Sequence, residues 1–120
     1  MIYDVIVVGS GIAGLMAAIE AKDENNKVAL ISKSNVFKSN SSMASGGINA
    51  VLDPNNTKEI NQHINDTLIS GKGLGNKKAI TYMCKQASKI VEKLIEYGVD
   101  FDRHENNKIL QRPFGGESSN

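Results

Sequence analysis

Three glycines near the start of the sequence have the spacing of a phosphate-binding turn. Gly9, Gly11 and Gly14 make up a Gly-x-Gly-x-x-Gly pattern. In this pattern the first glycine permits a tight turn, the second lets the backbone approach a pyrophosphate, and the third lets the next helix pack closely. Free N–H groups at the positive end of that helix then bind the anion. The candidate phosphate-binding residues are therefore Gly9, Ser10, Gly11, Ile12, Ala13 and Gly14.

The flanking sequence supplies the elements that such a turn needs. Val5–Val8 is a short apolar run, typical of a strand in a parallel sheet. Apolar residues at helical spacing then predict a helix over residues 12–24, and a second strand is expected over residues 28–32. This is the length of a β-α-β dinucleotide-binding unit, so we expect the strands to be parallel neighbours. An ordinary strand-turn-helix without a ligand is the alternative.

The composition argues against several other kinds of partner. The 120 residues carry 14 Lys and Arg against 13 Asp and Glu, so the charge gives no reason to expect nucleic acid or an acidic membrane. The single cysteine, Cys84, cannot form an internal disulfide, and no Cys and His cluster has metal-site spacing. We therefore expect a small-molecule partner and no metal. Because no leader or long hydrophobic run is present, the sequence predicts a cytoplasmic chain.

The residues that end the second strand bear on the kind of dinucleotide. An acid is expected here for a ribose hydroxyl, but the sequence has Ser32 and Lys33. In a nicotinamide enzyme this would count against NAD. A hydroxyl and a cation can still hold the adenosine half of a flavin dinucleotide, so the pattern favours FAD.

A polar stretch over residues 34–50 is a second candidate binding region. It has no clean helical or strand period, and a loop of this length in a small domain is usually functional. Backbone N–H groups around Gly46-Gly47 would approach a flat ring or a carboxylate, and Ser41, Ser42 and Ser45 would supply hydroxyls. A solvated loop is the alternative interpretation.

Five stretches taken together resemble one family of flavoproteins. They are residues 9–14, 30–33, 44–50, 79–84 and above all 111–118, which read QRPFGGES. These stretches are similar to the flavoprotein subunits of succinate dehydrogenase and fumarate reductase and to their relative L-aspartate oxidase. The similarity covers essentially the whole chain in the same order.

The resemblance implies a fold and a cofactor. The expected fold is α/β, a Rossmann-like FAD-binding domain fragment with a β-α-β unit, a helical excursion and a short hairpin. Residues 1–120 would be the N-terminal part of a longer FAD-binding domain, with the capping domain and the remaining FAD-binding segments absent. Beyond the glycine turn, the residues that the resemblance places at FAD are Ser32, Lys33, Asn40, Ser41, Ser42, Ala44, Ser45, Gly46 and Gly47.

Two departures from the family pattern bear on how FAD is held. Asn40 stands where the membrane-bound succinate and fumarate enzymes have a histidine that attaches covalently to the flavin. An amide cannot form that bond, so we expect FAD to be non-covalent. Ser45 stands where a glutamine is usual in those enzymes and in aspartate oxidases. Both departures favour the soluble fumarate reductases or a divergent member.

The final motif is where the resemblance places the substrate. Phe114 and Gly115, with Gly47 of the earlier loop, would lie near a four-carbon dicarboxylate, although core filling is the alternative for Phe114. The implied reaction is hydride transfer between flavin N5 and the double bond that relates fumarate to succinate. In this family an arginine of the capping domain supplies the proton, so no catalytic residue is assigned here. We expect the isolated 120 residues to bind FAD weakly and to be inactive.

Two other functions stay open from the sequence. L-aspartate oxidase would oxidise an amine with the same cofactor, although Asn49 and the QRPF segment favour the succinate and fumarate branch. A truncated, non-catalytic flavin-binding module is the alternative from another class. The resemblance also implies an iron-sulfur or cytochrome electron-transfer partner, which would hold the protein at the inner face of the membrane.

The sequence between the flavin loop and the final motif predicts two helices and a hairpin. Asn56 or Thr57 caps the first helix, which carries apolar residues at spacing four. The second helix spans residues 77–97, carries a continuous apolar stripe explained by core packing, and stops at Gly98. A short hairpin follows over residues 99–111.

Three further side chains could carry chemistry but have simpler explanations. Cys84 lies on the apolar stripe, so we interpret it as a buried hydrophobe rather than a reactive thiol. His63 and His104 each stand in polar sequence, which predicts surface residues rather than acids or bases.

Overall fold

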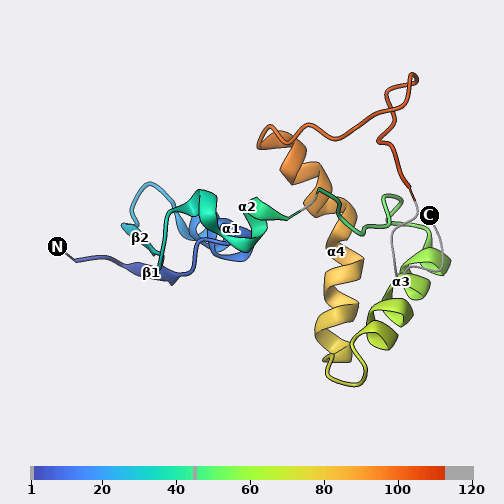
Figure 1. Cartoon of the computed structure of the whole chain (residues 1–120), viewed down its shortest axis with the longest axis horizontal. Helices are drawn as coiled ribbons and strands as arrows, with labels where there is room; N and C mark the ends of the chain where they lie inside the picture. Colours follow the sequence, from blue (N-terminus) through green and yellow to red (C-terminus); the bar gives the residue numbers. More distant parts are fainter. Residues whose placement is uncertain (1, 45, 113–120) are drawn as a thin grey trace. The chain divides into compact units, whose positions relative to one another are not determined.

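The computed structural model of the chain describes residues 2–44 and 46–112. The chain divides into two units, Met1–Gly47 and Ile48–Asn120, which are described one after the other. In chain order the elements drawn in Figure 1 are β1 (Val5–Val8), α1 (Ile12–Ala21), β2 (Val28–Ile31), the 3-10 helix η1 (Val36–Lys38), α2 (Asn40–Met43), α3 (Thr57–Ser70) and α4 (Lys77–Glu96). Within the described residues, no helix is both long enough and apolar enough to cross a membrane.

The first unit is built on two parallel strands joined by a helix. β1 and β2 pair in register from Val5 opposite Val28 to Val8 opposite Ile31. The N–H of Gly9 donates to the carbonyl of Ile31 at 2.8 Å, which brings the ends of the two strands level. α1 lies between them in the chain and contacts both strands. The predicted parallel β-α-β unit is therefore confirmed.

The crossover helix ends earlier than its sequence predicts. α1 stops at Ala21, and Lys22 is already extended at φ −81° and ψ 117°. Asp23 then folds the turn that leads to β2, because its Oδ1 accepts the N–H of Asn25 at 2.7 Å and that of Asn26 at 2.8 Å. An aspartate that bonds backbone groups two and three residues ahead competes with helix continuation.

The polar stretch over residues 34–50 contains short helices rather than continuous loop. In η1 the Asn35 side chain accepts the N–H of Phe37 at 3.0 Å, and in α2 the Ser39 hydroxyl accepts the N–H of Ser42 at 3.2 Å. Side-chain oxygens of this kind satisfy the donors of a first helical turn. Elements of three and four residues are too short to show a hydrophobic period, so the pattern could not predict them.

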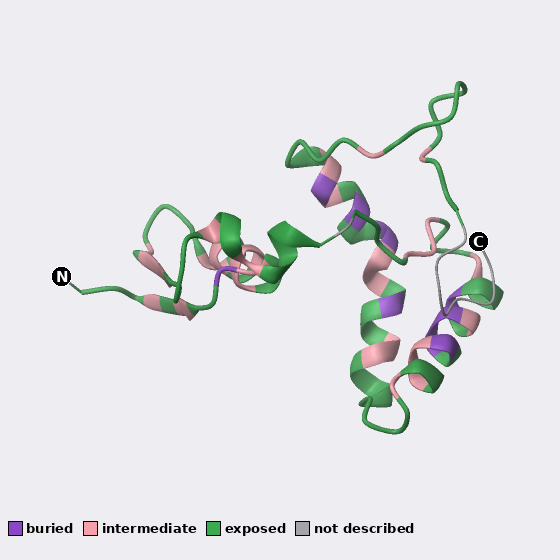
Figure 2. Ribbon diagram, in the orientation of Figure 1, coloured by how far each residue is buried: buried purple, intermediate pink, exposed green. Residues whose placement is uncertain are grey.

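The second unit is held by the packing of α3 against α4. Ile60, Ile64 and Cys84 form its buried cluster, and Leu68 and Ile80 are among the partly buried residues packed on it. Figure 2 shows that the buried positions of this unit fall on these two helices. Cys84 is 1% exposed, which confirms its interpretation as a buried hydrophobe.

Asparagine side chains cap the N-termini of both long helices. The Asn56 carboxamide oxygen accepts the N–H of Glu59 at 3.2 Å, so Asn56 is the cap of α3 among the two predicted candidates. The Asn76 oxygen accepts the N–H of Ala79 at 3.1 Å at the start of α4. Gly98 follows α4 with φ at +90°, the left-handed conformation of a helix stop, as predicted.

The apolar stripe of α4 is only partly buried. The prediction that core packing explains the whole stripe is therefore wrong. Val91 and Leu94 are buried, but Met83 is 51% exposed and Ile90 is 41% exposed. One neighbouring helix covers a single side of α4, whereas the apolar stripe is wider than that side.

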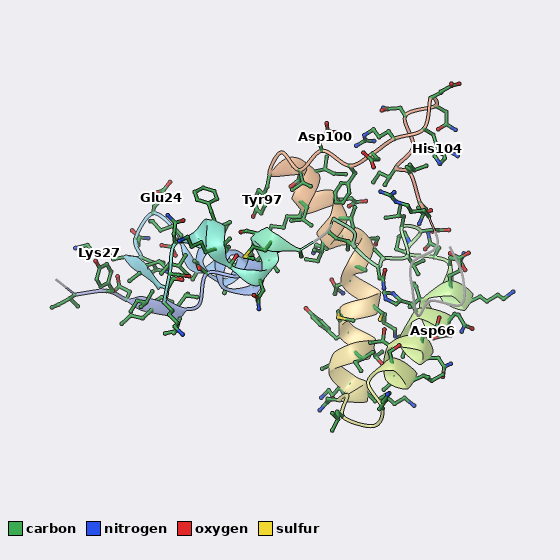
Figure 3. All side chains as sticks on the ribbon, in the orientation of Figure 1. Glu24, Lys27, Asp66, Tyr97, Asp100 and His104 are labelled. Carbon is green, nitrogen blue, oxygen red and sulfur yellow. The ribbon has the colours of Figure 1, made fainter. Side chains whose placement is uncertain are left out.

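The predicted surface position of His63 is wrong. His63 is only 7% exposed, because it follows Ile60 by three residues and precedes Ile64, which places it on the packed side of α3. Its Nδ1 has no hydrogen-bond partner among the described residues. Asp66, one turn further and labelled in Figure 3, is 5% exposed and accepts a 2.8 Å bond from Gln62 Nε2. Helical position, rather than the polarity of sequence neighbours, decides the burial of this side chain.

The predicted hairpin over residues 99–111 is reduced to one antiparallel bridge. Arg103 pairs with Ile109, and no named strand is formed in the described part of this segment. Asn107 has φ at +65° in the turn between them. His104, labelled in Figure 3, is exposed in this turn, as predicted. The segment is mostly exposed and polar, so it lacks the buried face that stabilises a longer ladder.

Candidate cofactor-binding site

The glycine turn has the backbone geometry that its spacing predicts. Gly9 has φ at +114°, a conformation that residues with side chains rarely adopt. A Cβ on Gly14 would lie 1.9 Å from the carbonyl oxygen of Gly9, so α1 begins against the turn with no room for a methyl group. A Cβ on Gly11 would meet Ser41 Oγ at 3.3 Å. The first and third glycines are therefore required by this fold itself.

The start of α1 is open to solvent. Its first two residues, Ile12 and Ala13, are exposed, and its N-cap Gly11 has no side chain to occupy the helix end. N–H groups in the first turn have no partner inside a helix, and the helix dipole makes this end positive. This exposed helix end therefore carries donors of the kind that a phosphate needs.

A pair of hydroxyls joins the glycine turn to the end of β2. Ser10 Oγ lies 2.6 Å from Ser32 Oγ, and either hydroxyl can be the donor. Ser10 is 5% exposed, whereas Ser32 and the next residue, Lys33, are exposed. The structure therefore brings together residues that the sequence assigns to the pyrophosphate and to the adenosine half of the dinucleotide.

A second bond joins the polar segment to the start of α1. The N–H of Ile12 donates to Ser41 Oγ at 3.1 Å, although the two residues are 29 positions apart. Ser41 lies on α2, which was not predicted as a helix. Two of the predicted cofactor-binding segments thus meet at one helix end.

The neighbouring hydroxyls make hydrogen bonds within the segment that contains α2. Ser39 Oγ and Ser42 Oγ lie 2.9 Å apart, and Ser42 Oγ also donates to the carbonyl of Val36 at 3.0 Å. The contact predicted between Ser42 and the cofactor stays a prediction, and its hydroxyl is already bonded within the segment. Sequence reasoning missed Ser39, whose one signal is that serine is a preferred N-cap residue.

The other predicted contacts are only partly described. Asn40, Ala44, Gly46 and Gly47 are exposed. Within the described residues, no group of His, Cys, Asp or Glu is placed to hold a metal ion. Three predicted positions, in the flavin loop and in the final motif, lie outside the described residues: Ser45, Phe114 and Gly115.

The described part of the site fits the pyrophosphate of a dinucleotide. Its donors are backbone N–H groups and serine hydroxyls, and Lys33 adds a cation beside Ser32. Donors of these kinds at a helix end suit an anion rather than a hydrocarbon group.

Comparison with known proteins places the chain in a family. The sequence model of the FAD binding domain family matches residues 4–120. The succinate dehydrogenase flavoprotein subunit of Rickettsia bellii is 45% identical over 114 residues, which is 95% of this chain and 19% of that protein. An L-aspartate oxidase of Nostoc is 43% identical over 102 residues, which is 85% of this chain and 17% of that protein.

A solved structure agrees with these relatives. A quinol fumarate reductase chain of E. coli superimposes with a TM-score of 0.86 at 31% identity, over 98% of this chain and 20% of that one. The chain therefore spans about a fifth of the length of the relatives it matches. Because the match runs through the strand, the glycine turn, the crossover helix and the polar segment that meets it, this chain belongs to the FAD binding domain family.

Proposed function

We propose that this chain is the FAD-binding portion of an oxidoreductase that interconverts fumarate and succinate. The observation that carries the proposal is the meeting of two segments at the start of α1, where Ile12 N–H bonds Ser41 Oγ at 3.1 Å. One segment would hold the pyrophosphate and the other would extend toward the flavin. Similarity to a succinate dehydrogenase subunit and to a quinol fumarate reductase supports the choice of substrate.

The residues of this chain bind and orient the cofactor. FAD, when bound, supplies the redox chemistry by carrying the hydride and electrons. N–H groups of the first turn of α1 would donate to its phosphate oxygens, and Gly14 lets α1 begin close against Gly9. Ser32 and Lys33 stand where the adenosine half would lie, and the backbone at Gly46 and Gly47 would face the flavin ring.

The substrate end of the proposed site involves residues from more than one part of a longer protein. Phe114 and Gly115, with Gly47, would border the dicarboxylate. We assign no catalytic residue to this chain, and we infer that residues 1–120 form one part of the FAD-binding domain. A separate capping domain would supply the proton donor, and an iron-sulfur or cytochrome partner would exchange electrons with the flavin.

The proposed attachment of FAD is non-covalent. Asn40 begins α2 and is exposed, and its amide nitrogen is not a nucleophile toward the flavin methyl carbon. Acid precipitation of the full-length holoprotein should leave the yellow flavin in the supernatant. Colour retained in the protein pellet would contradict this attachment.

The experiment that tests the function compares three substrates on the full-length protein. With fumarate, oxidation of a reduced viologen dye should yield succinate, because two electrons and two protons saturate the double bond. Succinate oxidation coupled to a dye should also occur and be slower, since a flavin without a covalent histidyl link has the lower potential that favours reduction of fumarate. Absence of both reactions from flavin-loaded protein would overturn the proposal.

L-aspartate oxidase is the second candidate function. The 43% identity to the Nostoc enzyme is the observation that favours it. That activity would oxidise the amine of L-aspartate to an imine and pass the electrons to oxygen or fumarate. Turnover of L-aspartate without turnover of succinate would select it, and FAD binding without any turnover would select a non-catalytic module.

A further inference from the structure

We propose that the turn between α3 and α4, together with the first half of α4, binds an anionic lipid surface. This region, which we call the basic end, is defined by five exposed lysines and contains the turn drawn in Figure 1 between the two long helices: Lys72, Lys77, Lys78, Lys85 and Lys89. The proposal goes beyond the reaction proposed above and does not depend on it.

The charges of the basic end are all of one sign. Every charged residue between Asp66 and Glu92 is a lysine, although the whole chain carries 14 basic and 13 acidic residues. None of these lysines forms an ion pair within the described residues. Clusters of about this many lysines are a usual signal for anionic headgroups, because each cation keeps its attraction for the surface. The nearly balanced charge of the whole chain therefore conceals a local basic region.

The lysines at the start of α4 oppose the charge preference of the helix itself. Lys77 and Lys78 are the first two residues of α4, and its first turn contains no acid. The helix dipole makes this end positive, so cations here lower the stability of the helix. The two lysines and the helix end instead add their positive potentials at one place. Local stability does not explain this arrangement, whereas attraction of an anionic surface does.

An exposed tyrosine lies in the same stripe of α4 as three of the lysines. Lys78, Tyr82, Lys85 and Lys89 follow one another at intervals of four, three and four residues, so they share one face of the helix. The buried residues of α4 lie on the other side. Tyr82 is 70% exposed. A tyrosine suits the headgroup level of a membrane, because its ring is apolar and its hydroxyl is polar.

Leu74 adds an apolar side chain at the tip of the turn. Its N–H donates to the carbonyl of Gly71 at 2.9 Å, and Lys72 and Gly73 between them have φ at +47° and +83°. Leu74 is 95% exposed. At a membrane surface such a leucine enters the interface while the lysines beside it meet the phosphates. A nucleic acid or a free phosphate would use the lysines and gain little from Leu74, so the lipid surface is favoured.

The test measures sedimentation of the full-length, FAD-loaded protein with lipid vesicles. Vesicles that contain phosphatidylglycerol should bind the protein at least about ten-fold more tightly than vesicles of phosphatidylcholine alone, and added salt should reduce the difference. Inorganic phosphate should compete no better than chloride at the same ionic strength. Stronger competition by phosphate would assign the lysines to a free phosphate and overturn the lipid proposal. No sedimentation with either kind of vesicle would also overturn it.

A charge reversal tests the lysines at the start of α4. Lys77→Glu combined with Lys78→Glu should weaken binding to the anionic vesicles by about ten-fold or more, since each lysine near such a surface contributes about five-fold. Lys77→Arg combined with Lys78→Arg keeps both charges and should bind like the parent. The reversed variant should melt no lower than the parent, because acids are favoured at the start of a helix. Unfolding would therefore not account for its loss of binding.

The matched control reverses two exposed lysines outside the basic end. Lys27→Glu combined with Lys108→Glu changes the net charge of the protein by the same amount and should retain most of the binding. A loss equal to that of the first double variant would show a response to net charge alone and would overturn the proposal.

A change at Leu74 tests the apolar part of the contact. Leu74→Ser should weaken vesicle binding by about five-fold without altering its salt dependence, whereas Leu74→Met keeps the apolar volume and should bind like the parent. If Leu74→Ser bound like the parent, the leucine would not enter the interface and the proposed lipid contact would be wrong. A protein that turns over no dicarboxylate would still bind these vesicles, so this proposal and the proposed function fail separately.

Discussion

The two units of this chain reach their structures in different ways. In Met1–Gly47, Ser10 is the only one of the described residues that is buried. The unit Ile48–Asn120 instead buries a set of apolar residues on its two long helices, as Figure 2 shows: Ile60, Ile64, Cys84, Val91 and Leu94. The unit with the proposed phosphate-binding turn is held by strand pairing, a close glycine contact and hydroxyl bonds, while the other unit is held by side-chain packing.

This difference explains which changes each unit should resist. In the first unit, Val8 is 81% exposed and Ile6 is 58% exposed, so little apolar packing maintains the site. Its shape depends on a few contacts that involve backbone atoms, and these cannot relax without moving the turn. In the second unit the contacts are between side chains, which can shift, so changes of volume should cost stability without reshaping a site.

The largest effect is expected from Gly14→Ala in the first unit. The added methyl would lie 1.9 Å from the Gly9 carbonyl oxygen, so the turn and α1 must separate. We expect FAD affinity to fall at least about 100-fold, which is about 3 kcal/mol, in fluorescence titrations of the full-length protein. Gly75→Ala is the matched control, because the one close contact of its methyl would be with the end of the flexible Ile80 side chain and because it lies in the other unit. Equal losses of FAD affinity in both variants would contradict the difference proposed between the two units.

A core substitution in the second unit should lower local stability and leave FAD affinity unchanged. Ile64→Ala removes buried apolar volume from the cluster with Ile60 and Cys84. We expect local stability of α3 and α4 to fall by about 2 kcal/mol, the lower end for such a truncation, because the cluster is small. Hydrogen exchange of peptides from these helices in the holoprotein measures it. Ile69→Ala, at a residue 67% exposed, should have much less effect, and FAD affinity should be unchanged in both.

A smaller effect is expected at the start of α4. Asn76→Ala removes the side-chain oxygen that accepts the N–H of Ala79 at 3.1 Å. Loss of such a cap should cost about 1 kcal/mol, seen as faster exchange in the first turn of α4. Asn76→Asp retains an acceptor and should exchange like the parent. If the alanine variant also exchanged like the parent, this cap would not stabilise the helix.

The smallest effect is expected at the surface of the second unit. Asp102 Oδ2 lies 3.4 Å from a guanidinium nitrogen of Arg112, and both side chains are largely exposed. Asp102→Ala should therefore change stability by less than about 0.5 kcal/mol, and raising the salt concentration should reduce even that. A larger loss in a denaturation curve would show that this pair does more than the usual exposed ion pair.

The elements with a long period or a strict spacing could be predicted from the sequence. The parallel strands, the glycine turn, α3, α4 and the stop at Gly98 all follow from apolar periodicity or from glycine conformation, and each is found. α2 could not be predicted, because one serine cap and four residues carry no period. His63 was misplaced because its neighbours in sequence are polar, although its spacing from Ile60 already put it on the apolar side of the helix.

The residues of the candidate site could be predicted from the sequence, but the hydrogen bonds that join them could not. Ser10 and Ser32 could be assigned to a cofactor from their positions next to the glycines and the strand end, and Ser41 from its place in the polar stretch and the family resemblance. Their bonds to one another and to α1 join residues 22 and 29 positions apart, and these depend on how the strands are registered. A single sequence gives the donors but not the distances between them.

The spacing of these bonds also has a consequence for the making of the protein. The partners in the Ser10 to Ser32 and Ile12 to Ser41 bonds are separated by 22 and 29 residues. At translation rates of about 5–20 residues per second, both partners leave the ribosome within a few seconds of each other. Closing a loop of this size costs little more entropy than closing a shorter one. The phosphate end of the cofactor site can therefore form on the nascent polypeptide, ahead of contacts that join more distant parts of the chain.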